Sequence, residues 1–290
     1  MKKELELVSI IIVTYNSAEY VIETLNSCIE QTYANIEIII SDDGSVDETL
    51  SLCNAWLVNL SVDVNVKIIT HTERRGIPAN CNRGANVASG QWLKFIGADD
   101  ILEPDAISNL MRCTTKDTGV VFSRFKTFGK SIFKEDIYPY PLTWDLVKKR
   151  ASGWNERMEW LFLLGFSNVA PGAFINKEAF YELGKYDESY YLLEDLPLWY
   201  KLFESKYSVR HCESITVNYR IHPKQATSNG ISDLLKKDLL KFTNEKRNKY
   251  IIPYYHNIAQ IKFLSNKKAA RFRYLNIVQV MIHIYNRLGR

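Results

Sequence analysis

Four apolar runs recur along the first third of the chain, and a segment with a helical pattern separates each run from the next. They cover residues 8–13, 36–41, 64–70 and 92–97. The first, VSIIIV, is rich in β-branched residues and is typical of a strand buried on both faces. Strands that alternate with helices in this way predict an α/β fold, a mostly parallel sheet with helices on both faces.

The segments between these runs carry helix signals. Ser17 precedes a stretch whose apolar residues fall on one side. Ser45 and Glu48 have the spacing of a capping box, which predicts that the second helix begins at Ser45. A third, short helix should follow Gly76 and end near residues 89–90. These signals support the alternation of strands and helices.

Polar side chains follow three of the expected strands, at the point where each strand ends. They are Thr14, Tyr15, Asn16, Asp42, Asp43, Asp99 and Asp100. A parallel sheet gathers the carboxyl ends of its strands at one edge, and ligands bind beyond that edge. Carboxylates that converge there need a cation, and oxygen ligands without nearby Cys favour Mg²⁺ or Mn²⁺ shared with a polyphosphate. The alternative is that DDGS and ADD are ordinary turns, because Asp and Gly are common turn formers.

The basic charge of the chain is concentrated at its C-terminal end. The formal net charge is +4, yet residues 231–290 contain thirteen Lys or Arg against three Asp or Glu. Apolar and aromatic residues interleave with these bases, and residues 272–285 show helical spacing. Such helices either lie on an anionic membrane surface or pack on the main domain with solvated lysines, and the sequence leaves both open. Nucleic-acid binding is disfavoured, because no nucleic-acid motif accompanies the charge.

Composition favours a reducing compartment. The apolar run at the N-terminus covers only residues 7–13, too short for a signal sequence, and no stretch reaches the roughly 20 apolar residues that cross a bilayer. The five cysteines are widely spaced and form no CxxC pair, which argues against a disulfide framework or a zinc site. We therefore expect a cytoplasmic protein, at the inner face of the cell membrane if the tail binds lipid.

Two stretches carry a more specific pattern. They are VSIIIVTYNSAEYVIETLNSCIEQTYANIEIIISDDGSVDET and, at residues 97–100, GADD. The first resembles the opening of family 2 glycosyltransferases, which have the GT-A fold, and the second resembles the DxD region of that family. The resemblance implies a GT-A domain over residues 1–225, with a nucleotide-binding half (1–105) and an acceptor-binding half (106–225). A basic helical C-terminal extension would follow over residues 226–290.

This resemblance implies roles for the polar residues of the first two strand ends. Thr14 and Tyr15, with Asn16 beside them, would contact the nucleotide base. Asp43 would accept a hydrogen bond from a base N–H, usually that of uracil, and Asp42 would support the turn.

The acidic pair after the fourth strand would serve the rest of the donor. Asp99 and Asp100 would bind the ribose and a Mn²⁺ or Mg²⁺ ion held by the donor diphosphate. The first acidic position of the common DxDD form is Gly97 here. This departure leaves open which of the two aspartates binds the metal.

Basic residues would complete the donor site. Cys81 stands where the family often has an Arg, so Arg75 or Arg83 would supply that charge. In YRIHPKQATS, which begins at residue 219, family members often carry an Arg-x-His pattern. His222 would then complete the metal shell, and Arg220 would neutralise phosphate charge. The alternative is that His222 is a surface residue in a loop.

The second half of the chain must supply a catalytic base. Glu194 and Asp195 precede an expected helix and resemble the ED motif of the family. In an inverting transfer the acceptor hydroxyl attacks the anomeric carbon opposite the nucleotide, so a carboxylate must take its proton. We predict that Asp195 is this base and that Glu194 orients the acceptor. The alternative is that both acids only favour a helix N-terminus through the macrodipole.

These features predict a metal-dependent, inverting hexosyl- or hexosaminyltransferase with a nucleotide-sugar donor, UDP-linked in the usual case. The resemblance and the basic tail imply a lipid-linked saccharide acceptor in the assembly of a surface polysaccharide, such as O-antigen or capsule. A non-catalytic nucleotide-sugar-binding scaffold subunit is the alternative, and the two intact acidic pairs speak against it. A sugar nucleotidyltransferase would need a Gly-rich basic loop after the first strand and a dehydrogenase a GxGxxG motif, and the chain has neither.

Overall fold

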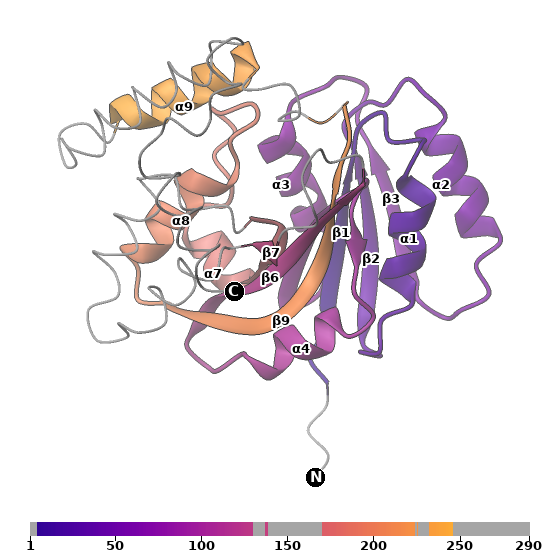
Figure 1. Cartoon of the computed structure of the whole chain (residues 1–290), viewed down its shortest axis with the longest axis horizontal. Helices are drawn as coiled ribbons and strands as arrows, with labels where there is room; N and C mark the ends of the chain where they lie inside the picture. Colours follow the sequence, from indigo (N-terminus) through magenta and orange to yellow (C-terminus); the bar gives the residue numbers. More distant parts are fainter. Residues whose placement is uncertain (1–4, 130–136, 139–169, 224, 226–231, 246–290) are drawn as a thin grey trace, which may run out of the picture.

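The computed structural model describes residues 5–129, 137–138, 170–223, 225 and 232–245 (Figure 1). These residues form one sheet with helices on both of its faces. Most of the basic C-terminal extension, including the expected helix over 272–285, lies outside the described residues. In the part of the chain that the structure describes, no helix is long and apolar enough to span a bilayer.

The sheet has the strand order β3-β2-β1-β4-β8-β6-β9-β5, and β7 pairs with β6. The strands are β1 (Val8–Thr14), β2 (Ile36–Asp42), β3 (Asn65–Thr70), β4 (Trp92–Gly97), β5 (Ile101–Leu102), β6 (Thr118–Gly129), β7 (Ile137–Tyr138), β8 (Ala173–Asn176) and β9 (Ser208–Ile221). The four longest pairings, β1 with β2, β1 with β4, β2 with β3 and β6 with β9, are parallel. The short pairings of β5, β7 and β8 are antiparallel. The mostly parallel sheet predicted from the sequence is confirmed.

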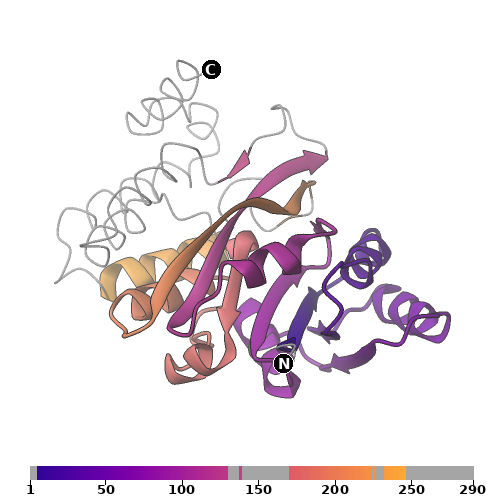
Figure 2. The same cartoon turned by 90° about the horizontal axis from the view of Figure 1, so that it is seen from below.

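Helices cover both faces of this sheet, as the two perpendicular views show (Figure 1, Figure 2). They are α1 (Val21–Ile29), α2 (Thr49–Val58), α3 (Ile77–Val87), α4 (Ala106–Arg112), the 3-10 turn η1 (Ala170–Gly172), α7 (Lys177–Glu182), α8 (Asp195–Phe203) and α9 (Asp233–Glu245). Helices α1, α2 and α4 pack on one face, and α3, α7 and α8 pack on the other. Helix α9 packs against α8 through Phe242 and Tyr200.

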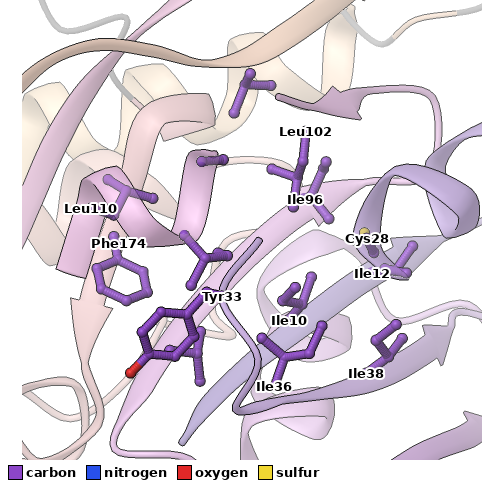
Figure 3. Packing of buried hydrophobic residues seen from close by; sticks show 14 of the residues in the cluster. Ile10, Ile12, Cys28, Tyr33, Ile36, Ile38, Ile96, Leu102, Leu110 and Phe174 are labelled. Atoms are coloured by element: carbon purple, nitrogen blue, oxygen red, sulfur yellow. The ribbon is translucent and has the colours of Figure 1, made fainter. Parts of the chain in front are cut away.

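The core explains why the first strand is apolar at almost every position. Successive side chains of a strand point to opposite faces of the sheet. Ile10 and Ile12 pack with Cys28 of α1 on one face (Figure 3). Ile11 packs with Ala85 of α3 on the other face. Both faces are therefore buried, and a continuous apolar run is needed rather than an alternating one.

Helix α2 begins at Thr49, so the predicted start at Ser45 is wrong. The Ser45 N–H donates to Asp42 Oδ2 at 2.8 Å, and the Ser45 hydroxyl donates to Asp42 Oδ1 at 2.5 Å. Ser45 thus belongs to the turn after β2. The Thr49 N–H donates instead to Asp47 Oδ1 at 3.0 Å. The other predicted strand and helix positions near the sheet edge agree with β1 to β4, α1 and α3.

Candidate active site

The carboxyl ends of β1, β2 and β4 meet at one edge of the sheet, as the sequence predicts. Thr14 is in register with Asp42, and its hydroxyl donates to Asp42 Oδ1 at 2.7 Å. The Asp43 N–H donates to the Thr14 carbonyl at 3.0 Å. On the other side of β1, the Ala98 N–H donates to the Val13 carbonyl at 3.1 Å. The acidic turn after β4 therefore starts at the same edge as the acidic turn after β2.

Asp42 organises the turn after β2. Its carboxylate is fully buried and accepts from the N–H groups of Gly44 at 3.0 Å and Ser45 at 2.8 Å. Gly44 has a φ of +77°, a left-handed conformation that glycine adopts without strain. With protein donors on both of its oxygens, Asp42 fits the turn-supporting role that the resemblance implies.

Asp43 fixes the loop that leads into α3. Its carboxylate is 3% exposed and accepts from the N–H groups of Arg75 at 3.0 Å and Gly76 at 2.8 Å. Arg83 Nη2 forms an ion pair with Asp43 Oδ1 at 2.9 Å, so the buried charge is paired and hydrogen-bonded. The Arg75 guanidinium has neither a hydrogen bond nor an ion pair within the described residues, and Arg75 is exposed. Of the two arginines considered as substitutes for the charge missing at Cys81, Arg83 is therefore engaged with Asp43 and Arg75 is open to a ligand.

Tyr15 presents an aromatic ring at this edge. The residue is 37% exposed, and the Arg74 guanidinium carbon lies 3.9 Å from the ring centroid. The same carbon lies 5.6 Å from the ring centroid of Tyr191. Asn16, with a φ of +50°, donates through its N–H to Ser45 Oγ at 2.8 Å and so ties the end of β1 to the turn after β2. No sequence pattern predicted Arg74 or Tyr191 at this edge.

The two aspartates after β4 have different surroundings. The Asp99 side chain is 28% exposed, and its Oδ2 lies 2.9 Å from His222 Nε2. Asp100 is buried, and its Oδ1 accepts from the Arg220 N–H at 2.9 Å. Burial, followed by the charge of Asp99, raises the pKa of the Asp100 carboxyl well above its ordinary value. A Cβ at Gly97 would lie 2.6 Å from Asp99 Oδ1, so the Asp99 carboxylate occupies the space that an acidic residue at 97 would need.

Arg220 is part of the same cluster. Its Nε donates to the Asp99 carbonyl at 2.7 Å, and its Nη2 donates to Glu23 Oε2 at 2.7 Å. The guanidinium carbon lies 4.5 Å from the ring centroids of both Tyr20 and Phe128. Arg220 thus holds the acidic turn against α1 in this structure. Sequence patterns pointed to Arg220 but not to Tyr20 or Glu23, because these contacts join opposite ends of the chain.

Glu194 and Asp195 lie at the start of α8. Burial, followed by the charge of Asp195, raises the pKa of Glu194 to about 8, and burial raises the pKa of Asp195 to about 6. The Glu194 side chain makes no capping hydrogen bond. An acid that only served the helix dipole would be stabilised as the anion and would have a lowered pKa. The raised values instead suit proton transfer near neutral pH.

The acidic pair of α8 is close to α3 and to Asp43. Cys81 of α3 is buried. Burial, followed by the charges of Glu194 and Asp43, raises the pKa of its thiol. Trp199 Nε1 is buried without a hydrogen bond inside the described residues, although its indole N–H is near enough to lower the pKa of Asp195. Asp195, the candidate base, therefore lies half-buried on the face of the sheet that α3 and α8 cover.

Asp99 and His222 fit a divalent cation. Among the described residues, no group of three or more His, Cys, Asp and Glu is placed to hold a metal by itself. His222 Nδ1 is buried with no hydrogen-bond partner there, and Nε2 faces Asp99. One carboxylate and one imidazole, completed by diphosphate oxygens and water, make a suitable donor set for Mn²⁺ or Mg²⁺.

The sheet order and the acidic edge define an α/β protein of the GT-A class, and solved structures share this fold. The structure of S. aureus TarS in complex with UDP-GlcNAc has a TM-score of 0.59 at 18% identity, covering 93% of this chain and 74% of that chain. The mannosyltransferase PcManGT from Pyrobaculum calidifontis, in complex with GDP-Man and Mn²⁺, has a TM-score of 0.57 at 16% identity, covering 94% of this chain and 71% of that chain.

The chain belongs to glycosyl transferase family 2, whose sequence model matches residues 9–184. Glycosyltransferase GlyG of Streptococcus pneumoniae serotype 4 is 34% identical over 128 residues, which are 43% of this chain and 41% of GlyG. Escherichia coli WfaP, a UDP-Glc:alpha-D-GlcNAc-diphosphoundecaprenol beta-1,3-glucosyltransferase, is 26% identical over 250 residues, 86% of this chain and 91% of WfaP. The chain thus matches less than half of GlyG but most of WfaP. The family and the fold that the resemblance implied are both confirmed.

Proposed function

We propose that this protein is a metal-dependent, inverting glycosyltransferase that moves a hexosyl or hexosaminyl group from a UDP-sugar to a saccharide acceptor. The proposal rests on the side chains that gather at the edge formed by β1, β2 and β4. They are the half-exposed ring of Tyr15, the carboxylate of Asp43 and the pair of Asp99 and His222. An aromatic face, a hydrogen-bond acceptor and a cation site are what a nucleoside diphosphate requires.

UDP is the nucleotide that we assign to the donor. The base would stack on Tyr15, and a base N–H would donate to Asp43 at the end of β2. The name of WfaP specifies UDP-Glc, and TarS is solved with UDP-GlcNAc. The GDP-Man bound by PcManGT makes GDP the nucleotide to compare.

A divalent cation would be held by Asp99 and His222. When bound, Mn²⁺ or Mg²⁺ neutralises the charge of the departing diphosphate. Arg75, exposed and unpaired inside the described ranges, would contact a phosphate from the neighbouring loop. Asp100 and Arg220 would hold the acidic turn in position through the 2.9 Å hydrogen bond between them.

Asp195 would act as the base. As the acceptor oxygen forms its bond to the anomeric carbon and the bond to the diphosphate breaks, the hydroxyl proton passes to the Asp195 carboxylate. Glu194, with its higher pKa of about 8, retains its proton at neutral pH and can donate a hydrogen bond to the acceptor. Two neighbouring carboxyl groups with different raised pKa values, about 8 and about 6, suit this division into a hydrogen-bond donor and a base.

A lipid-linked saccharide is the acceptor that we assign. The name of WfaP specifies a diphosphoundecaprenol-linked acceptor, and the match to WfaP extends over 91% of its length. The thirteen basic residues of 231–290, against three acidic ones, suit the anionic inner face of a cell membrane. The protein would then add a sugar during surface polysaccharide assembly in the cytoplasm.

Calorimetric titration of UDP, GDP and dTDP into the purified full chain, first with Mn²⁺ and then with EDTA, tests the donor site. We expect binding of UDP in preference to GDP and dTDP, weakened strongly by EDTA. Transfer is then measured by mass spectrometry with UDP-Glc, UDP-GlcNAc and a synthetic lipid-diphosphate-linked GlcNAc. Metal-dependent UDP binding without transfer from any donor would favour the scaffold alternative, and no nucleotide binding at all would refute the proposed site.

A further inference from the structure

Residues 189–193 lead directly into the acidic pair of α8, and helix α9 holds them in place. Asp238 of α9 is buried, and its Oδ2 accepts from the backbone N–H of Tyr191 at 2.8 Å and from that of Leu192 at 2.7 Å. Figure 2 shows α9 beside α8 at the side of the sheet away from α1 and α2. One carboxylate therefore fixes two consecutive peptide groups just before the proposed base.

Further contacts bind the same segment to α9. Lys241 Nζ donates to the Ser189 carbonyl at 3.0 Å, and the Tyr190 hydroxyl donates to Glu245 Oε2 at 2.5 Å. Phe242 is buried in an apolar cluster with Tyr190 and other residues of the segment and of α8. The attachment thus extends along the last turns of α9 rather than resting on one contact.

The opposite side of the segment touches the start of α3. The Tyr191 carbonyl accepts from the Ile77 N–H at 3.0 Å. A Cβ at Gly76 would lie only 2.4 Å from that carbonyl oxygen, so the two backbones are in close contact. Gly76 also donates to Asp43 at 2.8 Å. The 189–193 segment is therefore confined between α9 and the loop that Asp43 fixes on the nucleotide side.

Packing alone does not explain why an acidic residue stands at the buried position 238. A buried carboxylate is costly unless it is paired or hydrogen-bonded, and in the described part of the chain Asp238 has no ion-pair partner. An apolar side chain would fill the same space without that cost. The two charge-assisted hydrogen bonds to Tyr191 and Leu192 are what offset it.

We infer that Asp238 is a positioning residue for the transfer reaction: through Tyr191 and Leu192 it sets the place of the acidic pair of α8 against the donor site. The inference rests on the proposed function, because it assigns Asp238 a role relative to Asp195 as the base. It also makes α9 part of the catalytic unit. The sequence predicted instead that residues 226–290, which include α9, form an extension separate from the GT-A domain.

The test compares Asp238→Ala and Asp238→Asn with the wild-type chain. Asp233→Asn is the matched control, because Asp233 is an exposed acid in the first turn of the same helix. We expect kcat to fall about 10²-fold in Asp238→Ala, since small misplacements of a catalytic group cost that much. Asp238→Asn, which keeps one acceptor oxygen, should lose less. UDP affinity measured by calorimetry should stay unchanged in all three variants.

Amide hydrogen exchange supplies a readout that does not depend on catalysis. In Asp238→Ala the amides of Tyr191 and Leu192 should exchange faster, while those of β1 should not change. Fast exchange at these two amides with an unchanged kcat would overturn the inference. So would a loss of kcat accompanied by an equal loss of UDP affinity, which would indicate general unfolding. A wild-type chain that binds UDP but transfers nothing would refute the proposed function, and the catalytic role of Asp238 with it.

Discussion

His222 Nε2 lies 2.9 Å from Asp99 Oδ2, although 123 positions separate the two residues in the chain. The imidazole comes from the end of β9 and the carboxylate from the turn after β4. The ring of Tyr20 packs against the imidazole, with 4.9 Å between ring centroids. The imidazole is therefore already beside the carboxylate, and a small separation of the two would let both bind a cation.

Removal of the imidazole should weaken the metal-dependent part of UDP binding. Addition of Mn²⁺ should raise the UDP affinity of the wild-type chain. In His222→Ala we expect this gain to be smaller by about ten-fold or more, because the loss of a residue that supports a metal site typically weakens metal binding by that much. Affinity in EDTA should equal that of the wild-type chain, which serves as an internal control for folding. Calorimetry measures both quantities. A full Mn²⁺ response in His222→Ala would remove this residue from the metal shell.

A matched pair of variants should separate the two aspartates after β4. Asp99 is the more exposed and faces His222, whereas Asp100 is 5% exposed and accepts from the Arg220 N–H. Asp99→Asn should therefore abolish the Mn²⁺ response of UDP binding. Asp100→Asn keeps an acceptor oxygen for Arg220 and should retain most of that response. The reverse order of effects in the same titration would show that Asp100 is the metal ligand.

The parts of the fold that were predicted correctly are those that local sequence determines. The runs of β1 to β4 are apolar because both faces of the sheet are covered, and the apolar character can be read from each run by itself. The start of α2 was predicted wrongly because Ser45 donates to Asp42, so the capping-box pattern is used by the turn before the helix.

The same distinction between local and long-range information applies to the candidate site. Strand ends could be predicted to share an edge, so the gathering of Thr14, Asp43 and Asp99 at one edge was predicted from the sequence. The partners of these residues could not, because Arg220 with Glu23, and Asp238 with Tyr191, are contacts between distant segments. Such pairs depend on how β9 returns to α1 and on how α9 packs against residues 189–193, which no periodicity encodes.

Asp195→Asn should leave UDP binding unchanged and abolish transfer, because the amide cannot take the acceptor proton. The pH profile of the wild-type chain should reflect the same group. Burial raises the pKa of Asp195 to about 6, and the base must be ionised, so kcat/KM should fall as pH drops through about 6. Steady-state rates measured between pH 5 and 8 would show this fall, because that range spans the raised pKa of Asp195. An acidic limb at the ordinary pKa of an aspartate, or normal turnover in Asp195→Asn, would refute the assignment.

Glu194→Gln should stabilise the protein at high pH. The pKa of Glu194 is raised from 4.5 to about 8, so its contribution to stability is fully present below pH 4.5 and is lost as pH rises through 8. Glutamine does not titrate, so the variant should match the wild-type chain at low pH and exceed it increasingly up to pH 8. Thermal melts should show this as a Tm difference that grows with pH, about 2–4 °C for each kcal/mol. A Tm difference that is constant with pH would contradict the burial of an ionisable Glu194.

Tyr15→Ala should weaken nucleotide binding through loss of stacking. The ring is 37% exposed and already has a flat cation, the guanidinium of Arg74, at 3.9 Å. Stacking of a base on an aromatic side chain contributes about 1–3 kcal/mol, and Tyr15→Phe should retain it. Because the ring is proposed to stack on the base and not to contact the phosphates, Tyr15→Ala should weaken uridine and UDP by the same factor. A loss confined to UDP would instead mean that the substitution disturbs the phosphate contacts of the neighbouring loop, and the base would have to be placed elsewhere at this edge.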